Sequence, residues 1–147
     1  MSASGDLVLF RRAPADLNRR ALKEFARTLR DLVAGGREFH CLISDDRELR
    51  RLNRQFLGAD YATDVLSFPL GLNGLLGELA ISADRAAAQA REFGHSRLDE
   101  IRILMLHGVL HLAGMDHEND NGRMARVERR WRHAMGLPAG LIERVKA

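Results

Sequence analysis

The chain has 147 residues, of which 46% are apolar and 29% are charged, and its formal net charge is +3. This length and balance fit one globular domain, which we expect to span residues 1–147. No run approaches the roughly eighteen apolar residues of a membrane span, and the N-terminus lacks a secretory signal pattern. Because Cys41 is the single cysteine, an intramolecular disulfide is excluded, and we expect a cytoplasmic protein without a membrane partner.

Two strand–helix units are predicted in the first part of the chain. Residues 6–10 and 38–43 read as strands because they are short, apolar and bounded by turn or capping residues. The first strand is followed by apolar residues at helical spacing over 16–32. The second is followed by capping residues at 44–48, and the helix that they begin ends at Gly58.

A β-hairpin is predicted next. Residues 63–68 read as a strand that Pro69 closes, because proline cannot donate to a ladder of hydrogen bonds. The sequence GLNG at 71–74 supplies turn residues, and residues 75–81 read as the returning strand. The chain thus holds four predicted strands.

Three further helices are predicted. Ser82 caps an alanine-rich helix that runs to about Phe93. The helix that follows Ser96 is apolar on nearly every side, so it belongs in the interior. Asn119 or Asp120 caps a final helix that ends near Met135. With two helices in the first part, this makes about five helices and an α+β protein.

The segment HGVLHLAGMDH at 107–117 holds three of the six histidines. His107 and His111 are four residues apart, which places both side chains on one face of the buried helix. Gly114 allows the backbone to reverse, so that His117 can return over the same face. Ordinary polar residues satisfied by hydrogen bonds are the alternative, but they would not account for a matched triple on an apolar helix.

Three imidazoles around one cation leave a fourth position open for water, which is typical of catalytic zinc sites. A bound water can ionise near neutral pH and act as a nucleophile. Zinc is the first choice, although the ligands alone also allow nickel, cobalt or iron. Gly108 stands where the zinc peptidase motif H-E-x-x-H has its general base. Asp116 either orients an imidazole or accepts a proton, and stabilising the turn is the alternative role.

Arginine supplies most of the positive charge, and it occurs in clusters. Its planar guanidinium suits phosphate, so a nucleic acid is one candidate partner, whereas solvated helix faces are the alternative. Binding of such a partner is expected to be electrostatic and salt-sensitive, because the arginines offer phosphate contacts and no RNA-binding motif with stacking aromatic residues is present. The clusters lie at residues 11–12, 19–20, 47–54 and 123–132.

With these residues in view, the chain resembles the YbeY endoribonuclease family of bacterial rRNA maturation factors. That family has an H-G-x-L-H-L-x-G-x-D-H motif and a T-D-V-L-S-F-P segment, which are matched here by residues 107–117 and 63–69. Shorter matches, in the order of the family, are Leu52-Asn53, Gly58-Ala59-Asp60, GELAIS at 77–82, Glu128 and Met135-Gly136-Leu137.

The resemblance implies a single α+β domain with a small mixed four-stranded sheet and a buried metal-ligand helix. It implies one Zn²⁺ per chain on His107, His111 and His117, and cleavage of single-stranded RNA in 16S rRNA 3′ maturation and ribosome quality control. The ribosome or small-subunit proteins are the expected partners, and no DNA specificity is expected. The family usually has an arginine where this chain has Leu57.

The expected site therefore combines metal ligands with catalytic and substrate-binding residues. Arg54, three residues before Leu57 on the same predicted helix, is expected to contact the substrate and stabilise charge in the transition state. Asp116 is the second candidate catalytic residue, and Arg50 and Ser67 are further candidates for substrate binding. Two other functions are considered: a ribosome-associated RNA-binding or assembly factor with a mainly structural zinc, and a metallopeptidase-like hydrolase that lacks the usual glutamate.

Overall fold

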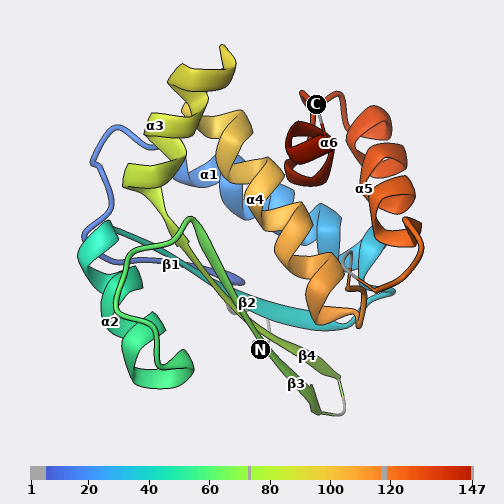
Figure 1. Ribbon diagram of the computed structural model, residues 1–147, viewed down its shortest axis with the longest axis horizontal. Coiled ribbons are helices and arrows are strands. Elements are labelled where there is room, and N and C mark those ends of the chain that lie inside the picture. The colour runs from blue at the N-terminus through green and yellow to red at the C-terminus, as the bar shows by residue number, and fades with distance from the viewer. Residues whose placement is uncertain (1–5, 73, 117–118, 147) are drawn as a thin grey trace.

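The computed structural model describes residues 6–72, 74–116 and 119–146 (Figure 1). Its strands form one mixed sheet in the order β1-β2-β4-β3. The first three of these pair in parallel, whereas β3 pairs with β4 in antiparallel fashion, as the predicted hairpin requires. The strands are β1 (Val8–Phe10), β2 (Glu38–Ser44), β3 (Val65–Leu72) and β4 (Leu75–Ser82).

Polar side chains begin most of the helices. Asp45, Ser82 and Ser96 each accept a hydrogen bond from the backbone N–H three residues further on, which satisfies a donor that the first turn leaves unpaired. The helices are α1 (Arg19–Thr28), its π-helical continuation η1 (Leu29–Val33), α2 (Asp46–Leu57), α3 (Ala83–Phe93), α4 (Arg97–Leu112), α5 (Arg123–Ala134) and α6 (Leu141–Lys146).

The α+β class and the four strands are confirmed, but several boundaries differ from the sequence prediction, notably those of β3 and α5. Strand β3 continues through Pro69 to Leu72 instead of closing at the proline. It can do so because β3 is an edge strand, where a missing N–H need not break the ladder. Helix α5 begins after Gly122, although Asp120 still accepts a hydrogen bond from the N–H of Met124.

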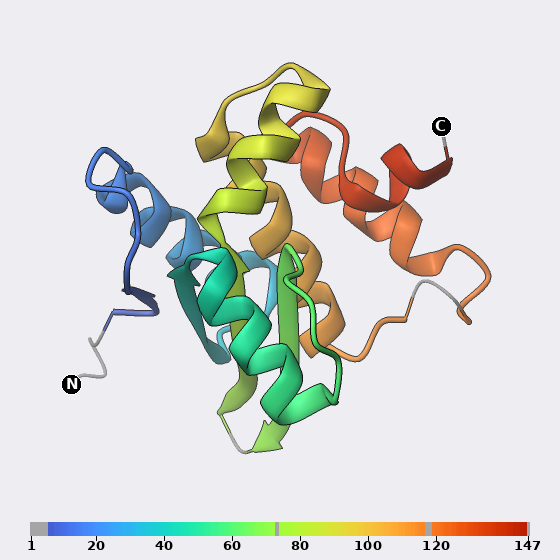
Figure 2. The ribbon, with the colours of Figure 1, turned by 60° about the vertical axis from the view of Figure 1, so that its left-hand side comes forward.

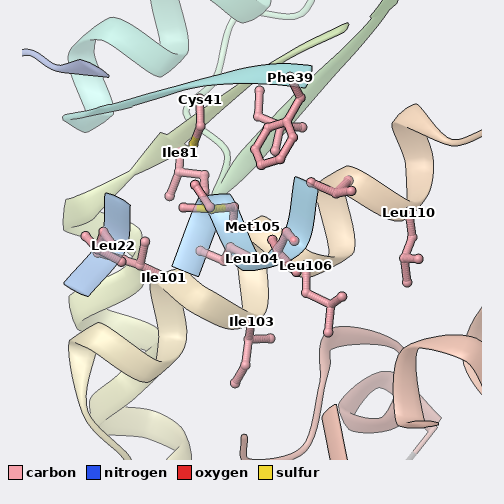
Figure 3. Close-up of a cluster of buried hydrophobic side chains, with 14 of the residues drawn as sticks. Leu22, Phe39, Cys41, Ile81, Ile101, Ile103, Leu104, Met105, Leu106 and Leu110 are labelled. Atoms are coloured by element: carbon pink, nitrogen blue, oxygen red, sulfur yellow. The ribbon is translucent and has the colours of Figure 1, made fainter. Parts of the chain in front are cut away.

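The sheet separates two unequal layers of helices, as Figure 2 shows. Helix α2 lies on one face, where a small cluster contains Leu49, Leu66 and Ala80. The main core lies on the other face, and α4 runs through it in contact with α1, α3, α5 and α6. Figure 3 shows side chains of α4 packed against Leu22, Phe39 and other residues of this core.

Helix α4 is the interior helix that the sequence predicted, since most of its 16 residues are buried. Gly108 lets it lie directly on β4: a Cβ at this position would stand 2.6 Å from Cδ2 of Leu79, which is itself buried. A glutamate therefore has no room at the position of the peptidase base, which argues against the peptidase-like alternative. No helix among the described residues is long and apolar enough to cross a membrane.

Candidate metal-binding cleft

Helix α4 brings His107 and His111 together on one face, one turn apart. Their Nε2 atoms are 3.1 Å apart, and the two rings meet at an interplanar angle of 75°. Two nitrogens held tetrahedrally by one ion at about 2.0–2.1 Å would be roughly 3.3 Å apart. The spacing of the pair therefore fits two ligands of a single metal ion.

The hydrogen bonds of the other ring nitrogens determine which atoms can face an ion. Nδ1 of His107 is 2.7 Å from Oε2 of Glu128, and Nδ1 of His111 is 2.9 Å from the carbonyl oxygen of Met115. A carbonyl or a carboxylate can only accept, so Nδ1 donates in both cases. In neutral rings this leaves lone pairs on the two Nε2 atoms, which point toward each other and suit a cation between them.

Glu128 comes from α5 and is 1% exposed, so its carboxylate is held within the core. Its second oxygen, Oε1, accepts a hydrogen bond of 3.1 Å from the backbone N–H of Ile142. Gly140 makes this approach possible, because a Cβ there would collide with the glutamate side chain. A carboxylate that fixes the tautomer and orientation of a ligand histidine is a common companion of metal sites.

The third predicted ligand, His117, lies outside the described residues, so its position relative to the pair stays a prediction. Among the residues that the structure does describe, no group of three or more His, Cys, Asp or Glu side chains could hold a metal ion. The two described histidines nevertheless fit such an ion by the distance between their Nε2 atoms and by their donor geometry.

The histidine pair opens into a cleft of about 430 Å³ between α4, the end of α2 and strand β3. Ser67 lines this cleft, and so does Leu57, at the position where the resemblance led us to expect arginine. Buried Asn53 fixes the loop that follows α2, because its side-chain amide donates to the carbonyl of Tyr61 at 3.0 Å. The remaining lining residues are Asp64, Val65, Leu66, Pro69, His107, His111 and Leu141.

The sequence prediction missed two acidic residues near the histidines, Glu128 and Asp64. Glu128 was only a match to the family pattern, and its contact with His107 joins residues 21 positions apart. Asp64 lies within the T-D-V-L-S-F-P segment and lines the cleft, and its Oδ1 accepts from the N–H of Val65 at 2.7 Å. The position of Asp64 in that segment was the available signal.

The other predicted site residues that the structure describes do not line this cleft. Asp116 is exposed at the end of the segment after α4, and its Oδ2 accepts from the Asn119 side chain at 3.0 Å. Arg50 and Arg54 line a separate depression on α2, where both face Asp60. The structure thus brings together His107, His111 and Ser67, while the two arginines stand apart.

Fold and cleft together define a class: small α+β proteins in which a buried helix presents a histidine pair to a cleft beside the sheet. Comparison with known proteins identifies one family within this class. The family described as Endoribonuclease YbeY matches residues 11–136. The chain belongs to this family.

Individual relatives agree with this assignment. An Endoribonuclease YbeY from Solibacter usitatus is 64% identical over 146 residues, covering 99% of both chains. Another, from Koribacter versatilis, is 44% identical over 138 residues, covering 94% of this chain and 91% of the relative. A solution structure of a Thermotoga maritima protein has a TM-score of 0.61 and 27% identity, covering 84% of this chain and 85% of that one. The predicted family is therefore confirmed.

Proposed function

We propose that this protein is a metal-dependent endoribonuclease that cuts single-stranded RNA, with one zinc ion per chain held by His107, His111 and His117. The observation that carries the proposal is the facing pair of Nε2 atoms on α4, 3.1 Å apart, whose rings are fixed through Nδ1. Membership of the Endoribonuclease YbeY family supplies the reaction class. When bound, a divalent ion supplies Lewis acidity and lowers the pKa of water toward neutrality.

The chain's own residues prepare the site for this chemistry. Glu128 holds His107 in the tautomer with Nε2 unprotonated, and the carbonyl of Met115 does the same for His111. Ser67 lines the cleft, which supports its proposed role as a hydroxyl contact to the RNA. Asp116, which precedes His117 in the sequence, is the proposed proton acceptor, and Arg50 and Arg54 are the proposed phosphate contacts on α2.

The biological substrate that we propose is the 16S rRNA precursor, cut during 3′ maturation and in ribosome quality control in the cytoplasm. The ribosome or its small-subunit proteins would then be the physical partners. Family membership supports this proposal, and so does the arginine content of the chain, since arginine pairs well with phosphate.

The test is cleavage of an unstructured RNA by protein purified free of contaminating nuclease and loaded with Zn²⁺. We expect native protein to cut, and His111→Ala to lose both the metal and the cleavage. His133→Ala is the matched control, because His133 is exposed on α5 and does not line the cleft. Equal cleavage by native protein and His111→Ala would refute the proposal.

One observation favours a second function, that of an RNA-binding or assembly factor with a mainly structural zinc. No arginine or lysine occurs among the described residues that line the cleft, and Leu57 is 57% exposed at its mouth. A cation there would stabilise the charge that develops on a phosphate during cleavage.

Leu57→Arg separates the two functions. In a nuclease, the restored cation should raise single-turnover cleavage by a factor on the order of a hundred at saturating enzyme. In a binding factor, the same change should alter RNA affinity modestly and leave cleavage absent. Leu57→Gln serves as the control for lost apolar surface without added charge.

A further inference from the structure

A second depression, distinct from the histidine cleft, is lined almost entirely by arginine. It has a volume of about 580 Å³ and lies where the chain leaving β1 meets α2. We call it the arginine basin, and its lining residues are Arg11, Arg12, Arg47, Glu48, Arg50, Arg51 and Arg54. From this basin we infer a site for RNA phosphates outside the cleft, an inference that rests on the proposed RNA substrate.

The basin is a built feature, because two segments far apart in the sequence converge on one buried carboxylate. Glu48 is 3% exposed and is paired with Arg11 at 3.3 Å and with Arg51. Burial raises the pKa of Glu48, but hydrogen bonds from Arg51 and Arg11 outweigh this and hold it below its ordinary value. Glu48 is therefore ionised at neutral pH and anchors the chain after β1 to α2.

The positive charge of the basin exceeds the negative charge near it. Two carboxylates face its arginines: Glu48, and Asp60, which pairs with Arg50 at 2.8 Å and lies 3.9 Å from Arg54. The guanidinium groups of Arg12 and Arg47 make no hydrogen bond or ion pair with any residue that the structure describes, and both residues are exposed. These two guanidiniums therefore keep all their donors for an external anion.

The backbone conformation at Arg12 supports the inference that this arginine serves the basin. Its φ is +55°, in the left-handed region that residues other than glycine, asparagine and aspartate adopt infrequently. The preceding residue still pairs with β2, since the N–H of Arg11 donates to the carbonyl of Ile43 at 3.0 Å. The chain thus turns sharply at Arg12, and the turn places this arginine on the wall of the basin.

Helix α2 connects the basin to the histidine cleft. Arg47 and Arg54 line the basin, and Leu57 at the end of the same helix lines the cleft. Leu57 follows Arg47 by ten positions along the helix, which corresponds to about 15 Å along the axis. A phosphate at Arg12 and Arg47 would therefore belong to a nucleotide several positions from the one in the cleft, on a strand that follows α2.

This arrangement points to RNA rather than to an acidic protein segment. Guanidiniums spread along a helix that ends at the cleft suit the repeated phosphates of one continuous strand. The inference predicts that RNA length matters: a strand long enough to reach from the cleft to the basin should bind more tightly than a trinucleotide that fills the cleft alone.

The test compares two double variants that remove the same charge. Arg12→Ala/Arg47→Ala alters the basin, and Arg129→Ala/Arg130→Ala alters exposed arginines of α5, across the sheet from α2. Affinity for a labelled, unstructured RNA of about 16 nucleotides is measured by fluorescence anisotropy over a series of salt concentrations, with a gel to show that the RNA stays intact.

We expect the basin variant to bind this RNA roughly tenfold more weakly at low salt. Its slope of log affinity against log salt should fall by about 1.4, since each phosphate contact to a single strand contributes about 0.7. The α5 variant should keep the native slope. Arg12→Lys/Arg47→Lys should restore the slope, and binding of the trinucleotide should be the same for all variants.

Identical slopes and affinities for the basin and α5 variants would overturn the inference, as would an equal loss for the trinucleotide. The proposed nuclease activity is judged separately, because binding is measured here without any need for cleavage. If native protein and His111→Ala cleave RNA equally but the basin variant still has a reduced salt slope, the nuclease proposal fails and the basin stands. If His111→Ala loses cleavage but the basin variant keeps the native salt slope, the basin alone fails.

Discussion

Glu128 shows how a residue outside the proposed metal ligands can set the protonation and orientation of one of them. Its buried carboxylate accepts from Nδ1 of His107 and from the N–H of Ile142, so it fixes the ring by two contacts from different parts of the chain. A substitution that removes this charge but keeps the shape of the side chain should make Nε2 of His107 a weaker ligand for a metal ion.

We expect Glu128→Gln to lower zinc affinity by roughly 10- to 100-fold, because the amide keeps the shape but not the charge that supports the imidazole. Competition with a chelator of known affinity would measure the change. Glu78→Gln is the control, since Glu78 is exposed. Far-UV circular dichroism should show both variants folded, and unchanged zinc affinity in folded Glu128→Gln would contradict the role given to the carboxylate.

At the scale of residues, sequence reasoning predicted the part of the site that is local. His107 and His111 are four residues apart on one helix, so helical geometry alone places them together. Glu128 and Asp64 come from other elements, and only the folded chain shows that they lie near the pair. Arg54 is close to Leu57 in sequence, yet its side chain belongs to the arginine basin and not to the lining of the cleft.

At the scale of elements, the close contact of α4 with β4 depends on Gly108. Alanine normally stabilises the interior of a helix by roughly 0.5–1 kcal/mol relative to glycine. Here a Cβ would lie 2.6 Å and 3.1 Å from the two methyl groups of Leu79, which is 2% exposed and packed in the core. The packing and the intrinsic helix preference therefore oppose each other at this position.

We expect Gly108→Ala to destabilise the protein by about 1–3 kcal/mol, because overpacking outweighs the helix preference. Denaturant unfolding of Gly108→Ala, Leu79→Ala and the double variant would measure this. The two changes should be non-additive, with Leu79→Ala relieving much of the penalty at position 108. A Gly108→Ala protein more stable than the native one would show that the contact is not tight.

The elements themselves were largely predictable, because their signals are local. Asp45, Ser82 and Ser96 act as the helix caps that their side chains suggest. The extension of β3 through Pro69 could not be predicted, since it depends on the strand lying at an edge of the sheet. Helix α6 is short and was not predicted. One of its residues, Ile142, donates a hydrogen bond from its backbone N–H to Glu128.

At the scale of the whole molecule, Glu48 couples the stability of the protein to pH. It is buried between the chain after β1 and α2, and its pKa lies below the ordinary value of 4.5. Because the folded-state pKa is lowered, its ionisation stabilises the fold fully above the unfolded-state pKa. That contribution is lost as the pH falls through the folded-state pKa, so the sensitive range lies below about 4.5.

We expect Glu48→Gln to reduce the free energy of unfolding by roughly 1–3 kcal/mol at neutral pH, because the two arginines lose a charged acceptor. The difference from native protein should shrink as the pH falls below about 4.5. Urea unfolding at a series of pH values would measure it, with Glu24→Gln as an exposed control. A difference that grows toward acid pH would contradict the sign of this coupling.

The two edge strands of the sheet affect how readily the protein self-associates. An open edge offers unpaired N–H and carbonyl groups to a strand of another molecule, which can begin aggregation. Here one edge, β1, is only 3 residues long, and the other, β3, contains Pro69 and a register shift between Pro69 and Leu72. The proline removes a hydrogen-bond donor from β3, and the register shift breaks the regular spacing of its backbone groups. Because β1 is short and β3 is irregular, neither edge offers a good template for a strand of another molecule. Pro69, which interrupts the expected strand pattern in the sequence, thereby protects a concentrated solution of the folded protein from edge-to-edge assembly.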